Sequence, residues 1–250
     1  NLFTRDFFSL AASRLKEDGI LSQWFHLYGM SGESTRSLIA TFRSVFPHTL
    51  VFKDRDLVLL GSRKPIRFDI RRMEQLFRET PVRENLSLTF VRFPFDLLIH
   101  LRLDEQGAEA FSRNAVVNTD DNLLLELAAP RSLFHDRIAD IRSEMARYSH
   151  AVIDHLTGYS SPAQVYYELA ASHFTAGNKE EALRLCLRSL KIEETFNGRK
   201  LSGQVLQAME RAQEAREEYK QALSLSQNDG ERRVVEALLR SLTSRGTPTR

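Results

Sequence analysis

Asp120, Asp121 and Glu126 are the densest acidic group beside an apolar run in this chain of 250 residues. Carboxylates bind hard cations and ammonium groups, so these side chains could hold a metal ion or an amine. The alternative is structural, because Asn118-Thr119-Asp120 is typical of a helix cap or turn, in which short side chains accept main-chain N–H groups. Tyr28 follows an expected strand and is a second candidate, as a wall of a ligand site or as ordinary packing.

Other catalytic groups are sparse. His150 and His155 are five residues apart, whereas metal-binding pairs on a helix are spaced by three or four. Cys186 is the only cysteine, which excludes a disulfide framework and a zinc thiolate cluster. The closest glycines, Gly29 and Gly32, form no G-x-G-x-x-G loop, so their segment is a ligand loop or a simple strand-to-helix turn.

The composition is that of a globular chain, with 42% hydrophobic residues and a net charge of +2 from 35 basic and 33 acidic residues. No basic arm is present, so nucleic acid is not indicated as a partner. No apolar run reaches the roughly 20 residues that cross a bilayer. We expect a cytoplasmic protein, or the soluble part of an inner-membrane protein.

Hydrophobic periodicity predicts the elements of the first section. A helix that ends at Gly19 is followed by a strand over 20–27, a helix that Pro47 ends, and strands over 49–53 and 57–60 joined by the turn 54–56. This order is how a doubly wound α/β sheet finishes. The chain begins at Asn1 within helical sequence, and we expect it to be a fragment.

The same section resembles the spermidine synthase-like proteins, in particular the bacterial branch fused to a membrane-transporter-like half. The similarity covers about residues 1–135 and keeps the family's order of motifs: Leu2–Phe8, Leu15–Trp24, Phe42–His48, Leu57–Ser62, Asn118–Asp121, Leu125-Glu126 and Ala129–Leu133.

This resemblance implies the C-terminal part of a Rossmann-like, class I methyltransferase-like sheet. In the family, the intact domain transfers an aminopropyl group from decarboxylated S-adenosylmethionine to a polyamine. Its cofactor loop and catalytic aspartate precede the Leu2-Phe3-Thr4 helix, so no cofactor site and no catalysis are expected in this chain. Gln23 matches the family glutamine that contacts the amine, and its alternative is an ordinary strand residue. The substrate-binding candidates are therefore Gln23, Tyr28, Asp120 and Asp121.

The last section is a repeat with a period of 33 residues. Ala182, Cys186, Ser189 and Leu190 recur as Ala215, Tyr219, Ala222 and Leu223. This period predicts stacked helical hairpins, and residues 169–182 resemble a tetratricopeptide repeat, with a weaker second copy whose turn 209–211 lacks glycine. Cys186 occupies a packing position, which favours a buried, inert thiol.

We therefore predict an α/β section over 1–66, a mostly helical extension over 67–135 and a tetratricopeptide-like array over 136–250, with helices 136–156 and 231–242 as its caps. Two functions stay open. The chain is a non-catalytic fragment of a spermidine synthase-like protein, or a protein-interaction module whose repeats bind a protein partner and whose α/β section is a scaffold.

Overall fold

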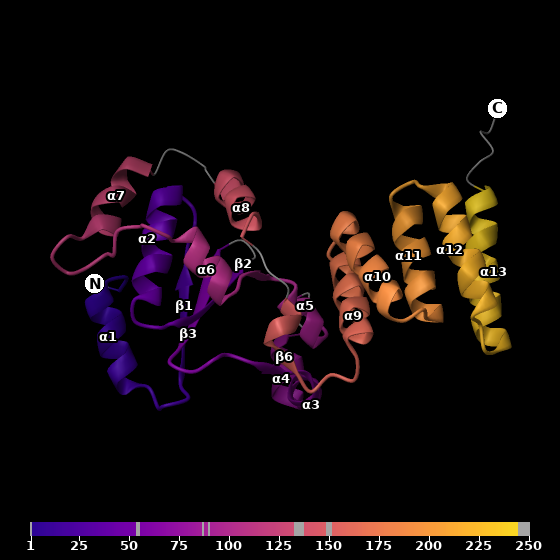
Figure 1. Ribbon diagram of the computed structural model, residues 1–250, viewed down its shortest axis with the longest axis horizontal. Coiled ribbons are helices and arrows are strands. Elements are labelled where there is room, and N and C mark those ends of the chain that lie inside the picture. Colours follow the sequence, from indigo (N-terminus) through magenta and orange to yellow (C-terminus); the bar gives the residue numbers. More distant parts are fainter. Residues whose placement is uncertain are drawn as a thin grey trace. The chain divides into compact units, whose positions relative to one another are not determined.

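The computed structural model describes residues 2–53, 56–86, 88–89, 91–132, 138–148 and 152–244. The chain forms two compact units, each built from two segments: unit 1 is Asn1–Phe68 with His100–Leu156, and unit 2 is Asp69–Ile99 with Thr157–Arg250 (Figure 1). The expected extension over 67–135 is thus divided between the two units, because its first helices pack with the array and the rest packs with the sheet. The turn residues Asp54 and Arg55, and His150, lie outside the described residues.

Unit 1 contains a four-stranded sheet in the order β1-β3-β2-β5. The strands are β1 (Ile20–Phe25), β2 (His48–Lys53), β3 (Leu57–Ser62) and β5 (Leu101–Leu103). Every neighbouring pair is antiparallel, so β1 and β2, which flank β3, run parallel to each other. The predicted mixed α/β section is present as this small antiparallel sheet with its helices, whereas a Rossmann-like sheet is not shown and stays a prediction.

Helices cover one face of this sheet: α1 (Arg5–Arg14), α2 (Gly32–Arg43), α6 (Glu105–Phe111), α7 (Leu124–Ser132) and α8 (Ile138–Ala146). Their apolar side chains and those of the strands form the main core, in which Phe8 packs edge-on against Phe42 at 5.0 Å between ring centroids. Ile141 and Met145, one helical turn apart on α8, are buried in this core. The described part of the helix expected within 136–156, α8, therefore packs in the core of unit 1.

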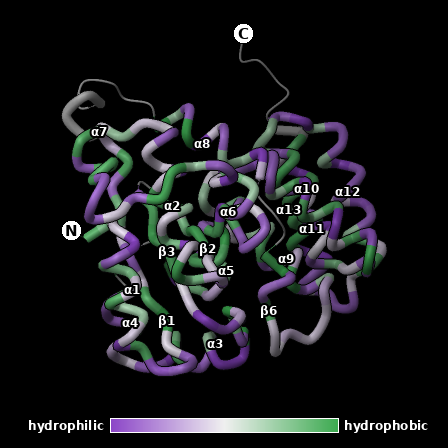
Figure 2. The backbone as a smooth tube through the Cα atoms, turned by 60° about the vertical axis from the view of Figure 1, so that its left-hand side comes forward, coloured by the Kyte–Doolittle hydropathy of each residue, from purple (hydrophilic) through white to green (hydrophobic). Residues whose placement is uncertain are grey.

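The opposite face of the sheet is covered only in part. Leu50, Phe52, Ile66 and Leu101 form a smaller core beneath β2 and β5. Hydrophobic residues concentrate along the strands (Figure 2), yet on this face of β1 Ile20 and Trp24 remain half exposed. The short strands β4 (Phe68–Asp69) and β6 (Leu156–Thr157) pair with each other, and the 3-10 helix η1 (Val152–His155) precedes β6.

Unit 2 is helical, with α3 (Ile70–Arg78), α4 (Thr80–Leu86) and α5 (Pro94–Leu98) beside the array formed by α9 (Pro162–Thr175), α10 (Lys179–Ile192), α11 (Phe196–Ala208), α12 (Ala212–Ser224) and α13 (Asp229–Ser244). Consecutive array helices pack together, and α5 packs against α9. The predicted cap α13 closes the other end, because Val235 and Leu242 are buried with Ala215 and Tyr219.

The 33-residue repeat is confirmed as a structural repeat. Ala182 and Ala215 are both fully buried, and Gly203 lies 33 residues after the fully buried Ala170. The two hairpin turns match as well: Gly177 has φ +82, and Glu210, 33 residues later, has φ 63. The second turn thus adopts the left-handed conformation with a glutamate. Glycine normally occupies such a position, because it has no Cβ atom to cause strain there.

Candidate interaction surface and predicted site residues

Asn118 is a structural joint of unit 1. Its side chain is fully buried, donates from Nδ2 to the carbonyl oxygen of Phe3 at 3.1 Å, and accepts at Oδ1 from the N–H of Leu125 at 3.3 Å. Its own N–H donates to Oγ1 of Thr41 at 2.8 Å. One residue thereby ties the segment before α1, the last turn of α2 and the start of α7 together.

The following turn is held by reciprocal hydrogen bonds. The N–H of Thr119 donates to Oδ1 of Asn122 at 3.0 Å, and the N–H of Asn122 donates to Oγ1 of Thr119 at 3.3 Å. Asp120 and Asp121 are exposed on this turn, and the N–H of Asp120 donates to Oδ2 of Asp6 at 3.0 Å. The contacts favour the turn interpretation of the acidic segment, and ligand binding by Asp120 and Asp121 remains a prediction.

Gln23 and Tyr28 contact their own neighbours along the chain. Nε2 of Gln23 donates to the carbonyl oxygen of Trp24 at 2.8 Å. The ring of Tyr28, 61% exposed, stacks on His26 at 4.3 Å between ring centroids. Neither contact brings these two residues together with Asp120 and Asp121, and their role in substrate binding also remains a prediction.

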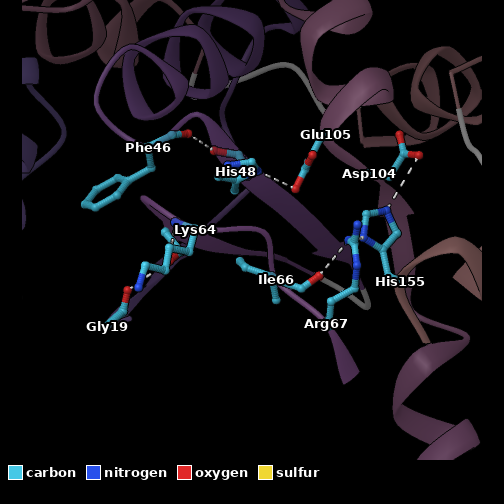
Figure 3. Close-up of polar contacts among 11 residues, drawn as sticks. Gly19, Phe46, His48, Lys64, Ile66, Arg67, Asp104, Glu105 and His155 are labelled. Carbon is cyan, nitrogen blue, oxygen red and sulfur yellow. Dashed lines mark hydrogen bonds and ion pairs between the residues drawn. The ribbon is translucent and has the colours of Figure 1, made fainter. Parts of the chain in front are cut away.

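The first turn of α6 binds two histidines that sequence reasoning did not single out as a site (Figure 3). Nδ1 of His48 lies 2.8 Å from Oε1 of Glu105, and Nε2 of His155 lies 3.8 Å from Oδ2 of Asp104. Asp104 also caps α6, accepting from the N–H of Gly107 at 2.7 Å. Partners 57 and 51 residues apart carry no spacing signal, so only the fold reveals them.

His155 is 5% exposed, and Arg67 donates from Nη1 to its Nδ1 at 3.2 Å. A guanidinium only donates, so Nδ1 must accept and the ring proton must lie on Nε2, facing Asp104. This ring links the end of η1 to the segment before β4 and to α6. The group fastens unit 1 internally, with His155 and Asp104 buried and Arg67 at the surface.

In unit 2, α9 and α11 contact each other directly as well as through α10. On each of these two helices, residues spaced by three or four positions lie on one side and are not fully buried. We call the surface that they form the α9–α11 face. It consists of Gln164, Tyr167, Ala171 and Phe174 on α9, and Asn197, Lys200, Gln204 and Ala208 on α11.

The α9–α11 face is suited to a polypeptide ligand. The side chains of Gln164, Asn197 and Gln204 carry amides, whose donors and acceptors match main-chain groups. In the structure Gln164 donates to Glu168 at 2.5 Å and Asn197 accepts from Lys200 at 3.0 Å, so a ligand would share or replace these two contacts. Ala171 and Ala208 allow close approach. In stacked helical repeats, the small rotation between neighbouring hairpins creates extended concave binding surfaces of this kind.

Partly buried polar contacts hold the helices behind this face together. The phenol of Tyr219 donates to Oε1 of Gln207 at 2.7 Å, and Nε2 of Gln207 donates to Oγ of Ser241 at 3.1 Å, so three helices are tied in a chain. Arg199 joins α11 to α12 through Glu218 at 3.1 Å. Burial raises the pKa of the Cys186 thiol to about 12, which agrees with the prediction of an inert thiol.

Among the described residues, no helix is long and apolar enough to cross a membrane, and no group of three or more histidine, cysteine or carboxylate residues could hold a metal ion.

A family model for the tetratricopeptide repeat matches residues 201–229, from the middle of α11 through α12 to the first residue of α13. The match falls on the copy that appears weaker in sequence. Neither the curated proteins nor the solved structures include a match to this chain. The comparisons therefore support the tetratricopeptide-like part of the prediction and give no support to the spermidine synthase-like part.

Proposed function

We propose that the chain is a protein-interaction module whose helical array binds a segment of a partner protein on the α9–α11 face. The observation that carries this proposal is the similarity of residues 201–229 to a tetratricopeptide repeat, a class that generally mediates binding between proteins. The amide and aromatic side chains of the face supply the contacts, and the chain of hydrogen bonds through Gln207 keeps the supporting helices rigid.

Matched variants of the face test this function. Ala171→Arg and Gln204→Arg place bulky cations on the α9–α11 face, whereas Gln213→Arg places the same charge on an exposed position of α12. We expect a partner captured from the native organism by the unmodified chain to be lost by the first two variants and kept by the third. Equal capture by all the chains would contradict the assignment of the face.

A second candidate for unit 1 is the spermidine synthase-like function, and the order β1-β3-β2 favours it. Two parallel strands, β1 and β2, are connected through α2 and flank the antiparallel β3, which agrees with the predicted end of a doubly wound sheet.

We propose that residues 1–250 do not bind decarboxylated S-adenosylmethionine, because their sequence contains no glycine-rich phosphate loop. Micromolar binding of this compound in titration calorimetry would refute the proposal. Weak saturable binding of spermidine, abolished by Asp120→Asn with Asp121→Asn, would support the predicted acidic contacts.

A further inference from the structure

The array contains a third helix of the same kind as α9 and α11. α13 begins 33 residues after α11, and the fully buried Val235 lies 33 residues after the fully buried Ser202. Gln207 of α11 donates to Ser241 of α13 at 3.1 Å, so these two helices are in direct contact. Because stacked repeats place equivalent residues on one surface, the α9–α11 face continues onto α13. There it consists of Gly230, Arg233, Ala237 and Ser241, the positions 33 residues after Asn197, Lys200, Gln204 and Ala208.

One position of the repeat carries a hydrogen-bond donor on all three helices. It is occupied by Tyr167, Lys200 and Arg233, which follow one another at intervals of 33 residues. We call these three side chains the donor row. Packed helices lie about 8–10 Å apart, so neighbouring members of the row are about 10 Å apart.

The two cations of the donor row are not neutralised by carboxylates. Nζ of Lys200 donates to Oδ1 of Asn197 at 3.0 Å and lies 5.2 Å from the centre of the Phe196 ring, and neither of these groups is charged. Nε of Arg233 donates to the main-chain carbonyl of Asp229 at 3.2 Å. In the part of the chain that the structure describes, neither cation forms an ion pair, whereas Arg184, Arg199, Arg211 and Lys220 of the same array each pair with a glutamate.

The carboxylates of these helices lie outside the face. No residue of the face on α9, α11 or α13 is an aspartate or a glutamate. Glu236 of α13 takes the position of Gly203, which on α11 faces α12. Glu168 of α9 is turned towards α3 and α5, since burial, together with repulsion from Glu74 and Asp96, raises its pKa.

We propose that the partner segment bound on this face is acidic, with carboxylate side chains that pair with Lys200 and Arg233. The inference rests on the proposed function and adds the chemistry of the partner. An extended segment advances about 3.3 Å per residue, so two carboxylates about three residues apart reach both cations. The phenol of Tyr167 donates to a further oxygen of the segment. Complementary charges of this kind speed the encounter and select against basic segments.

Selection from a library of short random peptides tests this chemistry on residues 1–250. The peptides are displayed on phage ahead of a coat protein, so none of them ends in a free carboxylate. We expect aspartate and glutamate to be enriched at least about threefold over lysine and arginine among the bound peptides. Selected peptides that are neutral or basic would overturn the inference and leave the proposed function standing. A library from which no peptide is enriched would overturn both.

Charge reversal tests the role of the donor row. A selected acidic peptide, amidated at its C terminus and labelled with fluorescein, is titrated with each chain and followed by fluorescence anisotropy. Lys200→Glu with Arg233→Glu should weaken its binding at least about tenfold, because two attractions become repulsions. Lys191→Glu with Arg216→Glu changes the net charge equally on α10 and α12 and should weaken it less than about threefold.

Far-UV circular dichroism checks that both double variants keep the helices of the array. If the first does not, Lys200→Gln with Arg233→Gln takes its place, and about a threefold loss of affinity is expected from the missing cations alone. An equal loss in the row variant and in its control, or no loss in the row variant, would overturn the assignment of the acidic segment to Lys200 and Arg233.

Discussion

Replacing Gly203 with alanine should destabilise the helical array, because α11 packs closely against Tyr219 of α12 at this residue. A Cβ atom at position 203 would lie 2.4 Å from Cε1 and 2.5 Å from Cδ1 of Tyr219. Ordinary contacts are 3.5 Å or more, so the ring would have to move by about 1 Å. Tyr219 cannot yield easily, since it is fully buried and its hydroxyl is bound to Gln207.

The expected loss follows from three contributions. Overpacking a rigid core costs about 1–3 kcal/mol, and displacement of the tyrosine hydroxyl from Gln207 costs about 1 kcal/mol more. Alanine is the better helix former and returns about 1 kcal/mol. The net destabilisation should be about 2 kcal/mol, measured by urea unfolding followed by far-UV circular dichroism.

Two further variants test whether the clash with Tyr219 causes the loss of stability. Gly230→Ala at the exposed start of α13 makes the same chemical change without a clash against a buried ring, so it should not destabilise the chain and should gain at most about 1 kcal/mol. Tyr219→Leu provides room for the added methyl group, so the double variant with Gly203→Ala should show a favourable coupling of about 1 kcal/mol. If Gly203→Ala is neutral or stabilising, the close approach described for these helices is wrong.

Four other predictions follow from the structure. Glu210→Gly should stabilise the array by about 1 kcal/mol, because φ 63 is strained for glutamate, and Gly177→Ala should destabilise it by a similar amount; thermal unfolding measures both. Asn118→Ala should cost about 2–3 kcal/mol because it leaves the buried main-chain groups of Phe3 and Leu125 without partners, whereas exposed Asp121→Ala should cost almost nothing. Cys186 should resist thiol reagents at pH 8 until the chain is unfolded by urea, since burial raises its pKa to about 12; rapid labelling of the folded chain would contradict this. Burial, together with repulsion from Glu74 and Asp96, raises the pKa of Glu168, so the folded state holds this proton more tightly than the unfolded state and loses stability as the pH rises above 4.5; Glu168→Gln should therefore raise the melting temperature at pH 7 and lose this advantage below pH 4.5.

The local elements could be predicted because their causes lie within a few residues. Thr4 and Ser31 cap α1 and α2 by accepting from the N–H groups of Phe7 and Ser34, and each precedes an apolar run of helical spacing. The hairpins of the array were predictable for the same reason, since Ala182 and Ala215 recur at a fixed distance where two helices must approach closely. Periodicity reports which face of an element is buried.

Periodicity does not report what that face is buried against. For this reason the helix expected within 136–156 was assigned to the array by its sequence. Ile141 and Met145 give α8 an apolar stripe that fits an array or a sheet equally well, and only the tertiary structure places the stripe in the core of unit 1. The division of 67–135 between the two units has the same cause. The polar contacts of Asn118 also depend on residues distant in sequence, Phe3 and Thr41, so the sequence could not show them.

By itself, the sequence determined the first helices and strands of unit 1, the repeat of 33 residues and its likeness to tetratricopeptide hairpins, because each of these depends on patterns that repeat within a turn, a strand or a hairpin. It did not indicate β5, which lies in the section expected to be mostly helical. The tertiary structure alone decided the antiparallel order of the sheet, the burial of His155 between Arg67 and Asp104, and the packing of α8 in the core of unit 1. Each of these depends on which distant segments meet, and that choice is made by the packing of the whole unit and not by any local pattern.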